Sequence, residues 1–510
     1  MLLSSIATLS ASSVFIGTGV LFVTFFIVRS FYRIYWHPLA KYPGPAYAAC
    51  SSIPSAIISV LRKEPQWIQH LVKQYGNDTP IRILPNLLVF PQPSALKEIY
   101  WDPKCNTKTG LYGTGILGPP HLFTTLDGDE HRDLRKALAG SPWSIGSLKN
   151  HWETRFDDQV QLLVRKLIEK AQTGESFVLS DKVAEFAADI MTMVSFTSPF
   201  GFVENGRDER LILQNWREGL DMFGFVGRFK FFQTHIIKIP GLAARILPKL
   251  TDPAGMGWLM GEADRQVSTR EEQIKQGIAI EKPDFMQHCL DARMHGKPLS
   301  AIQKRAHVTL LIQAGADTTG TALGSILRFL ITGPEQLKKA QKEIKNADDA
   351  GLLSTPVKYE EVRQHLPYFV ACIKEGLRLN PPATNLFGRV IGKEGKTVDR
   401  FFLPPGTEVT SHAYVVQRDP ELYAPDPDVF RPERWLVSEE KANELDAVSF
   451  TFGIGPRVCL GKDIAIMEIY KLLPELIRRF EFQLVKSGEY VVAGGVAYNK
   501  NFIVKAKRRD

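Results

Sequence analysis

Phe452-Gly-Ile-Gly-Pro-Arg-Val-Cys-Leu-Gly461 is the stretch of sequence that decides the fold. Two glycines precede Cys459 and one follows it, and glycine permits positive φ angles and a close approach of the backbone to a flat object. A helix is predicted to begin just after the cysteine, so its N-terminal N–H groups and dipole would stabilise an anionic sulfur. Arg457 can pair with a carboxylate, and Phe452 can pack beside the sulfur and exclude water. The loop therefore indicates a cysteine thiolate that acts as a ligand.

Two simpler interpretations of this cysteine are less favoured. A lone cysteine is more often a small buried hydrophobic residue than a ligand, but the flanking glycines and arginine point away from that role. A zinc site would need a second cysteine or histidine close by, and the sequence has none near Cys459.

The loop resembles a known family signature. It matches the cysteine motif Phe-x-x-Gly-x-Arg-x-Cys-x-Gly of cytochrome P-450 at Phe452, Gly455, Arg457, Cys459 and Gly461. The resemblance implies haem b with Cys459 as the axial ligand of the iron, where the sulfur pushes electron density onto the metal and favours O–O cleavage. It also implies a monooxygenase that inserts one oxygen atom from O2 into a lipophilic small molecule.

A second motif follows in the order that the family shows. Glu375 and Arg378 are three residues apart on a helix predicted from Tyr368 to Leu379, so they share one face. Alone, this spacing describes an ordinary surface ion pair of little energetic value. The stretch Phe430-Arg-Pro-Glu-Arg-Trp435 comes next, and the resemblance implies that Arg434 joins the pair in a buried network with a structural role.

Three further residues are candidates for binding the haem propionates. Asp127-Gly-Asp-Glu-His-Arg-Asp-Leu-Arg135 resembles the family's C-helix and places His131 and Arg135 four residues apart on one helical face. The family often has tryptophan at the His131 position, so Arg135 is the stronger candidate. Arg389 matches another propionate-binding arginine. Two buried carboxylates need cationic partners, which explains several separate arginines.

A long apolar helix, predicted over Ala301–Leu330, has an unusual polar centre, Ala314-Gly-Ala-Asp-Thr-Thr319. Glycine costs about 1 kcal/mol inside a helix relative to alanine. The stretch could be a simple kink or a surface stripe, but sequences break local rules most often where function demands it. It resembles the family's I-helix motif, in which Ala314 and Gly315 would leave a groove for O2. Thr318 would hydrogen-bond the reacting oxygen or a water beside it, and Asp317 would relay protons from solvent.

This acid–alcohol pair separates the functional hypotheses. Family members that isomerise or dehydrate peroxides need no protons for O2 activation and usually depart from the pair. Because this chain keeps Asp317 and Thr318, the resemblance favours monooxygenation over a haem-thiolate isomerase or dehydratase. The competing class is a non-catalytic haem sensor or carrier.

The N-terminus is predicted to be a membrane anchor. No charged residue precedes Arg29, and the apolar stretch from Leu2 to Val28 exceeds the roughly 20 residues that span a bilayer as a helix. A cleaved signal peptide is the alternative, but no basic residue precedes the apolar run. The expected organisation is an anchor at 1–28, a basic, proline-rich linker at 29–45 and one haem-binding catalytic domain at 46–510. The positive-inside rule predicts that the catalytic domain lies in the cytoplasm. The resemblance implies a single-pass protein of the endoplasmic reticulum membrane.

The rest of the chain predicts a fold that is mainly α with minor β, and the resemblance implies that this is the cytochrome P-450 fold. A hairpin is expected at Ile81–Leu84 and Leu87–Phe90, around Pro85-Asn86. Further helices are expected at Trp152–Lys170, Ser180–Ser195, Glu209–Asp221 and Lys462–Phe480, and strands at Gly392–Thr410 and Glu481–Ala506.

The charge and the cysteine content of the chain indicate its redox compartment and its possible binding partners. The 510 residues carry a net charge of +8 and only 5 widely spaced cysteines, which favours a reducing compartment over a disulfide framework. No nucleic-acid motif or long basic block occurs, so nucleic acid is not an expected partner. The resemblance implies electrons from NADPH through a membrane-bound NADPH–cytochrome P-450 reductase, with cytochrome b5 as a further candidate donor.

The substrate is expected to be lipophilic. By family position, the pocket includes residues from Lys108–Phe123, Gln313–Ala314, Ala383–Phe387 and Gly494–Tyr498. The phenylalanine-rich, basic segment Asp221–Leu250, which includes Lys238, is expected to touch the membrane surface. The approach His37-Pro-Leu-Ala-Lys-Tyr-Pro-Gly-Pro45 looks like filamentous-fungal, pisatin-demethylase-like members, which tailor terpenoids, polyketides and alkaloids. Gln417 departs from the histidine of many relatives, and the sequence suggests no consequence.

Overall fold

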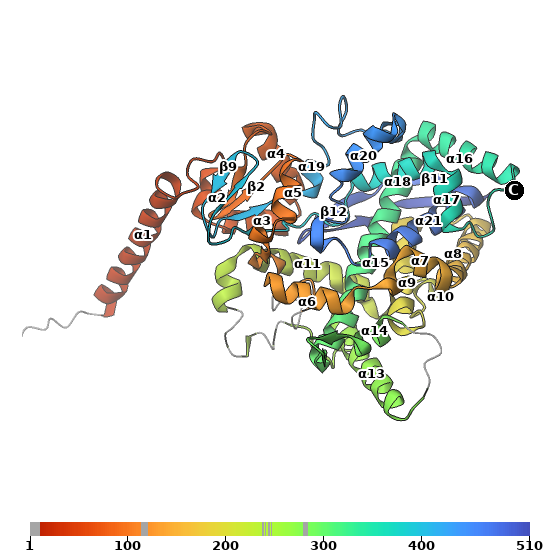
Figure 1. Ribbon diagram of the computed structural model, residues 1–510, viewed down its shortest axis with the longest axis horizontal. Helices are drawn as coiled ribbons and strands as arrows, with labels where there is room; N and C mark the ends of the chain where they lie inside the picture. Colours follow the sequence, from red (N-terminus) through yellow and green to blue (C-terminus); the bar gives the residue numbers. More distant parts are fainter. Residues whose placement is uncertain are drawn as a thin grey trace, which may run out of the picture.

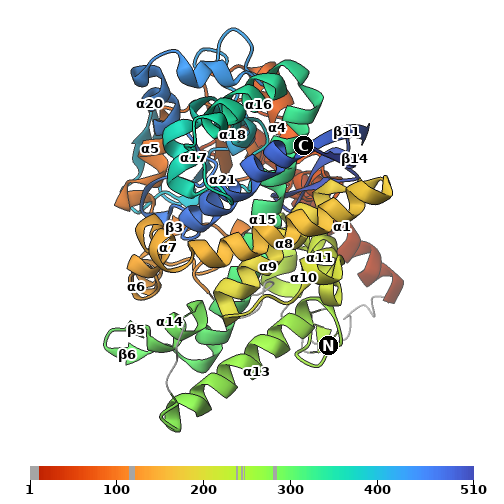
Figure 2. The same cartoon turned by 90° about the vertical axis from the view of Figure 1, so that its right-hand side faces the viewer.

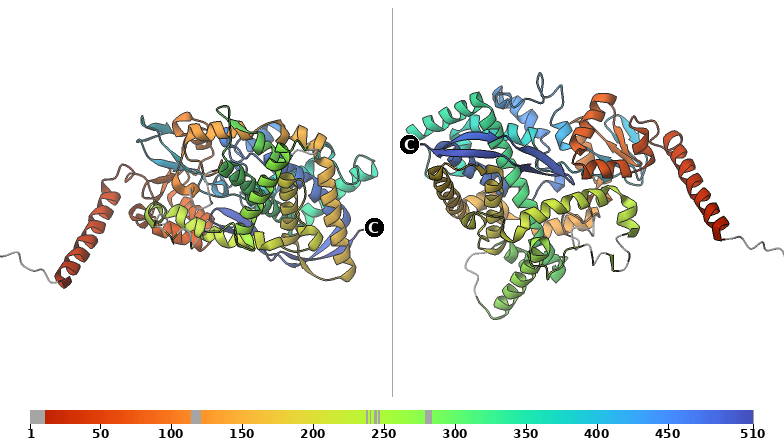
Figure 3. Two further views of the ribbon diagram at one scale, coloured as in Figure 1. Left: turned by 90° about the horizontal axis from the view of Figure 1, so that it is seen from below. Right: turned by 180° about the vertical axis from the view of Figure 1, so that it is seen from behind.

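The computed structural model describes residues 11–113, 121–236, 247–278 and 284–509, together with residues 239, 241, 242 and 245. The fold is mainly α with minor β, which confirms the expected class. A helix-rich body carries α1 at one end, and the C-terminus lies at the opposite end (Figures 1 and 3). In the view of Figure 2, α13 protrudes below this body.

The helices of the body are numbered along the chain. Their bounds are α2 Ala46–Cys50, α3 Ile53–Val60, α4 Glu64–Tyr75, α5 Ala95–Tyr100, α6 Gly128–Leu138, α7 Ile145–His151, α8 Glu153–Thr173, α9 Leu179–Phe196, α10 Phe202–Asn205, α11 Ile212–Arg228, α13 Gly255–Lys275, α14 Phe285–Asp291, α15 Ala301–Thr332, α16 Pro334–Asp349, α17 Tyr359–His365, α18 Pro367–Leu379, α19 Ala413–Val416, α20 Glu439–Ala447 and α21 Lys462–Arg479. The predicted helices are therefore present, but the one expected at Glu209–Asp221 begins later and ends later. Glu209–Leu211 forms a 3-10 turn with positive φ at Arg210 and Leu211, and the α-helix runs from Ile212 to Arg228.

The N-terminal helix α1 spans Ala11–Tyr35, and residues 1–10 of the expected anchor lie outside the described part. Its segment Phe15–Tyr35 is, within the described residues, the one helix long and apolar enough to cross a membrane. The helix continues past Val28, so the first part of the expected linker is helical. Arg33 Nη1 donates to the carbonyl of Cys50 at 2.5 Å, and Arg82 Nη1 donates to the carbonyl of Arg33 at 2.7 Å. These bonds join α1 to the body.

A five-stranded sheet near α1 places the side chains of Lys108 and Arg389 next to each other. It has the order β1-β2-β10-β7-β3, formed by Ile81–Leu84, Leu87–Val89, Glu408–Thr410, Arg389–Val390 and Thr107–Lys108. The predicted hairpin is its first antiparallel pair. Strands β3 and β7 are antiparallel with Lys108 opposite Arg389. The sheet register therefore brings together two basic side chains that are nearly three hundred residues apart in sequence.

The remaining strands confirm the predicted C-terminal β structure. A three-stranded sheet has the order β11-β14-β4, from Phe480–Lys486, Ile503–Arg508 and Phe177–Val178. Strands β12 (Glu489–Ala493) and β13 (Val496–Lys500) form a hairpin that turns at Gly494-Gly495. Short two-stranded pairs are β5 Arg293–Met294 with β6 Lys297–Pro298, and β8 Lys396–Val398 with β9 Phe401–Leu403.

Helix α15 runs through the centre of the body and packs closely on α9 (Figure 2). It begins at a capping box in which Ser300 and Gln303 satisfy each other's backbone N–H groups. A Cβ at Gly320 would lie 2.8 Å from the Cα of Ala184, and a Cβ at Gly315 would lie 2.4 Å from Sδ of Met191. Gly320 is thus required for the close packing of α15 on the backbone of α9, whereas a Cβ at Gly315 would force the flexible Met191 side chain to move.

Candidate active site

A cavity of about 350 Å³ lies between α15 and the cysteine loop, Phe452–Gly461. Cys459 is exposed, but the surface it exposes faces this internal cavity. Ala314, Gly315 and Thr318 of α15 line the same cavity, and Ala314 is exposed as well. The structure therefore brings the two predicted reactive segments, more than a hundred residues apart, to one space.

The cysteine loop is shaped by its backbone. The N–H of Cys459 donates to the carbonyl of Phe452 at 2.8 Å and closes the loop. Gly455 has φ +77°, and a Cβ there would lie 2.7 Å from the carbonyl oxygen of Tyr100. Glycine at this position is therefore required both by the backbone conformation and by contact with α5. Gly461 has an ordinary φ of −89°, and it lines the cavity, as Phe452 also does.

The Cys459 sulfur lies just before α21, as predicted. Burial raises the pKa of the Cys459 thiol, although the backbone N–H of Gly461 and the positive charges of Arg135 and Lys462 act in the opposite direction. A metal cation bonded to the sulfur would displace the proton, because thiols coordinate metals as thiolates.

Four basic side chains, which we call the cation cluster, line the cavity: Lys108, Arg135, Arg389 and Arg457. Among the described residues, none of them hydrogen-bonds to or pairs with a carboxylate. Burial and the charge of Arg389 lower the pKa of Arg457 to about 10, and its Nη1 is buried without a hydrogen-bond partner. Burial and the three guanidinium groups lower the pKa of Lys108 well below its usual value. Such mutually repelling cations fit a ligand with two carboxylates.

His131 and Arg135 lie on α6, whose first turn is capped by Asp127. The Asp127 carboxylate accepts hydrogen bonds from the N–H groups of Asp129 and Glu130, each at 2.9 Å. Both predicted residues line the cavity. Burial and the charge of Lys108 lower the pKa of His131 to about 2, so its imidazole is neutral at neutral pH.

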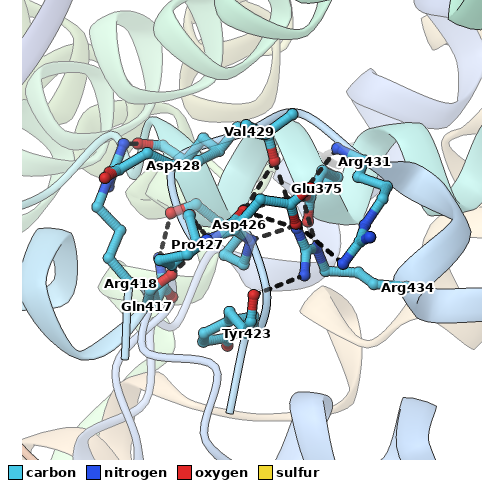
Figure 4. A network of polar contacts seen from close by, with 12 residues as sticks. Glu375, Gln417, Arg418, Tyr423, Asp426, Pro427, Asp428, Val429, Arg431 and Arg434 are labelled. Atoms are coloured by element: carbon cyan, nitrogen blue, oxygen red, sulfur yellow. Dashed lines mark hydrogen bonds and ion pairs between the residues drawn. The ribbon is translucent and has the colours of Figure 1, made fainter. Parts of the chain in front are cut away.

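Behind the cysteine loop, Glu375 is the centre of a buried ion network (Figure 4). Its carboxylate accepts hydrogen bonds from Arg378 Nε and Nη2, each at 2.8 Å, and from Arg434 Nε at 2.9 Å. The Trp435 indole N–H donates to it at 3.0 Å. Burial alone would raise the pKa of Glu375, but the Arg378 hydrogen bonds and the two positive charges outweigh burial and lower it. The structure therefore joins the three residues that the resemblance placed together.

Gln417 connects this network to the cysteine loop, a role that the sequence did not suggest. Its Oε1 accepts hydrogen bonds from the N–H of Phe450 at 2.8 Å and from Thr451 Oγ1 at 3.0 Å. Its Nε2 donates to the carbonyl of Arg378 at 3.0 Å, and Arg378 Nη1 donates to the Gln417 carbonyl at 2.7 Å. One amide side chain thus joins the end of α18 to the start of the cysteine loop.

We expect Gln417→Leu to lower the free energy of unfolding by about 2–3 kcal/mol, because it leaves buried backbone donors and acceptors unpaired. Gln417→Glu is the comparison variant: it keeps an acceptor for the N–H of Phe450, loses the donor to the carbonyl of Arg378 and adds a buried carboxyl group. Chemical denaturation monitored by tryptophan fluorescence measures both variants. Equal stability of Gln417→Leu and the unsubstituted protein would contradict this role.

The polar centre of α15 divides into two sides. Thr318 lines the cavity, and its Oγ1 donates to the carbonyl of Ala314 at 2.6 Å. Asp317 points elsewhere and is buried, with 1% of its side chain exposed. Its carboxylate is held by Arg217 of α11 through Nη2 at 2.7 Å and Nε at 2.9 Å. Arg217 also lies 3.9 Å from Asp181, whose side chain is half exposed.

Sequence reasoning missed two residues that line the cavity, Lys108 and Glu468, and Arg217, which holds Asp317 outside it. Lys108 fell within an expected pocket range, but its place in the cation cluster depends on strand pairing. Arg217 had no recognisable signal, because it lies on a helix a hundred residues before its partner. Glu468 of α21 lines the cavity, and both its carboxyl oxygens are buried without hydrogen-bond partners among the described residues. Burial raises the pKa of Glu468 well above its usual value.

The expected substrate ranges contribute to the cavity wall, as far as they are described. Residues 114–120 of the first range lie outside the described residues, as does Lys238. Helix α11 adds Trp216, Leu220 and Phe223 to the wall. From the expected ranges, the wall includes Lys108, Tyr112, Leu122, Phe123, Gln313, Ala314, Ala383, Asn385, Phe387, Gly495 and Val496.

Comparison with known proteins agrees with this geometry. The cytochrome P-450 family model matches residues 85–491. The cytochrome P-450 monooxygenase esdpH of Penicillium shearii is 29% identical over 498 residues, covering 96% of each chain. The monooxygenase ABA1 of Pyricularia oryzae is 29% identical over 513 residues, covering 96% of this chain and 97% of its own. The monooxygenase gsfF of Penicillium aethiopicum is 29% identical over 482 residues, covering 92% of this chain and 93% of its own.

Cytochromes P-450 are oxidoreductases that incorporate oxygen from O2 and carry haem iron. The residues around the cavity fit that cofactor, because they combine one inward-facing cysteine with unpaired buried cations suited to two propionates. The match covers most of the chain, and the chain belongs to the cytochrome P-450 family.

Proposed function

We propose that the chain is a monooxygenase that oxidises a lipophilic small molecule and that Cys459 would hold the iron of haem b through its sulfur. The observation that carries the proposal is the pairing of Cys459 and Ala314, both exposed into one cavity from opposite elements. When bound there, haem supplies the activation of O2 that the side chains themselves lack.

The chain's own residues would hold the cofactor in distinct ways. Arg135, Arg389 and Arg457, with neutral His131 beside them, would bind the two propionates. Phe452 would shield the sulfur, Gly455 would keep the loop in its turn, and Gly461, Ala314 and Gly315 would leave room for the flat macrocycle. Glu375, Arg378 and Arg434 would hold the loop from behind without touching the cofactor.

Protons would reach the reacting oxygen through α15. Thr318 Oγ1 borders the cavity and can donate a hydrogen bond there after leaving the carbonyl of Ala314. Asp317 is the adjacent acid, but Arg217 holds its carboxylate. Delivery therefore requires Asp317 to exchange Arg217 for a water or for Thr318.

We expect Asp317→Asn to slow product formation by about 10²-fold, the usual contribution of a positioned proton donor. Haem content and the ferrous–CO spectrum should stay unchanged, because Asp317 does not line the cavity. Asp181→Asn is the matched control, with a rate within about twofold, because its pairing with Arg217 is partly screened by solvent. The rate of product formation with NADPH and reductase measures both variants. An unimpaired Asp317→Asn enzyme would contradict this proton route.

The electron donor and the cellular compartment are inferred from the family resemblance. We propose NADPH–cytochrome P-450 reductase as the donor, with cytochrome b5 as a second one. We also propose that α1 anchors the chain in the endoplasmic reticulum membrane, with residues 46–510 as a cytoplasmic catalytic domain. The exposed apolar segment Phe15–Tyr35 supports the membrane anchor, and the family resemblance suggests the compartment. The fungal relatives support a tailoring step in secondary metabolism, and the apolar wall that includes Leu220, Phe223 and Phe387 supports a lipophilic substrate.

A reconstituted assay tests this proposal. The purified protein with reductase should consume NADPH and O2 together when an accepted lipophilic substrate is added. Turnover of a substrate without NADPH or O2 consumption would instead indicate a haem-thiolate isomerase or dehydratase.

A further inference from the structure

One part of the cavity wall has no regular secondary structure. Residues 121–125 form a turn in which the N–H and Oγ1 of Thr125 both donate to the carbonyl of His121, each at 2.9 Å. Leu122 and Phe123 of this turn line the cavity. Phe123 also packs against a cluster formed by Leu220, Phe223 and Tyr498 on the α11 side. We call residues 121–125 the wall turn.

Lys108 holds the wall turn from the side of the cation cluster. Its Nζ donates to the carbonyl oxygens of Leu122 at 3.0 Å and Phe123 at 2.8 Å. The same ammonium lies 4.8 Å from the ring centroid of Tyr112 and 6.0 Å from that of Phe123. Lys108 is 4% exposed, so these bonds form away from solvent. Two consecutive carbonyl groups are thus fixed by one buried side chain.

His307 of α15 holds the wall turn from the opposite side. Its Nε2 accepts a hydrogen bond from the N–H of Leu122 at 2.9 Å. Its Nδ1 donates to the carbonyl of Gln303 at 2.6 Å, which fixes the tautomer with an unprotonated Nε2. Burial lowers the pKa of His307 to about 4, so the acceptor persists at neutral pH.

The two side chains therefore bind both backbone polar groups of Leu122 and the carbonyl of Phe123. Such bonds replace the sheet or helix bonds that the wall turn lacks, and an unpaired buried N–H or carbonyl would be costly. Lys108 and His307 are not part of the proposed proton route through Asp317 and Thr318. We propose that Lys108 and His307 are positioning residues that fix the wall turn and thereby determine how bulky a ligand the cavity accepts. This proposal rests on the proposed function, because its probes bind haem iron.

Three azoles of increasing size test the proposal: imidazole, phenylimidazole and tritylimidazole. All bind haem iron through nitrogen, but only the larger two extend toward the cavity wall, so imidazole reports the haem alone. Dissociation constants are measured from the shift of the haem absorption band in the full-length holoprotein. The variants are His307→Leu, which removes the acceptor, and His307→Gln, which can still accept from Leu122 N–H.

We expect His307→Leu to change the phenylimidazole-to-tritylimidazole affinity ratio by about tenfold, which corresponds to about 1.4 kcal/mol. Imidazole affinity should stay within about twofold, and His307→Gln should keep the original ratio within about threefold. An unchanged ratio in His307→Leu would overturn the proposal. Equal changes in both variants would overturn it too, because they would assign the effect to packing of the ring. Failure of imidazole to bind the unsubstituted protein would count against the haem assignment instead.

Hydrogen exchange gives a second readout that does not depend on the cofactor. Amides of the wall turn should exchange at least about tenfold faster in His307→Leu and in Lys108→Met, while amides of the α15 core should not change. Lys108→Met addresses the wall turn from its other side, so it also serves if His307→Leu fails to fold. Unaltered exchange of the wall turn in both variants would contradict the proposal.

Discussion

Cys459→Ser is expected to abolish the red-shifted ferrous–CO band of a thiolate-ligated haem, and with it all product formation. The sulfur faces the cavity directly, and no other cysteine among the described residues lines it. A serine hydroxyl is a harder, weaker donor and would not supply the electron density that favours O–O cleavage. The ferrous–CO difference spectrum measures the change.

Cys50→Ser is the matched control for this substitution. Cys50 is half-buried, lies at the end of α2 and does not line the cavity, so its replacement should leave the spectrum unchanged. A Cys459→Ser protein that keeps the band would refute the assigned ligand. Loss of the band in Cys50→Ser as well would mean that the spectrum reports general stability.

Glu375→Gln is expected to lower the free energy of unfolding by about 3–5 kcal/mol, the usual cost of breaking a buried ion network. The glutamine keeps the shape of the side chain but leaves the guanidinium group of Arg378 buried without a counter-charge, and Arg434 keeps only the partly exposed Asp426. Because Gln417 joins Arg378 to the cysteine loop, the loop should loosen and haem should dissociate faster. Chemical denaturation and the rate of haem transfer to apomyoglobin measure these effects.

Asp426→Asn is the control within the same network (Figure 4). Asp426 pairs with Arg434 at 3.0 Å and Arg431 at 2.9 Å, but its side chain is 31% exposed. Its replacement should cost at most about 1 kcal/mol because solvent screens the pair. If Glu375→Gln were no more destabilising than Asp426→Asn, the buried network would not support the loop.

Because the pKa of Glu375 is lowered, the stability loss expected for Glu375→Gln depends on pH. A carboxyl group whose pKa is lower in the folded state contributes stability above its unfolded pKa, and that contribution is lost as the pH falls through the folded value. The difference in stability between the unsubstituted protein and Glu375→Gln should therefore be largest near neutral pH and shrink in acid.

The sequence predicted most of the elements and the local parts of the site. Cys459, Arg457 and Gly455 belong to one short loop, so their spacing alone constrains their geometry. Helix α15 was predictable because its apolar pattern is long. The contacts of Gln417, Lys108 and Arg217 were not predictable, because each depends on a partner from a distant element. Strand register placed Lys108 beside Arg389, and packing of α11 on α15 placed Arg217 on Asp317.

Gly315 illustrates a related limit. A glycine within a helix signals that something approaches closely, but the sequence does not say what. The resemblance pointed to oxygen, whereas the structure also shows Met191 of α9 at that position. Local patterns thus indicated where the special residues lie, and only long-range packing defined their neighbours.

Labelled O2 tests the central claim most directly. The holoprotein is supplied with NADPH, reductase, isotopically labelled O2 and a lipophilic substrate selected by its effect on the haem spectrum. We predict that the product carries a single labelled oxygen atom and that NADPH consumption matches product formation. A product without label, or one formed equally well without O2, would contradict the assignment of this chain as a monooxygenase.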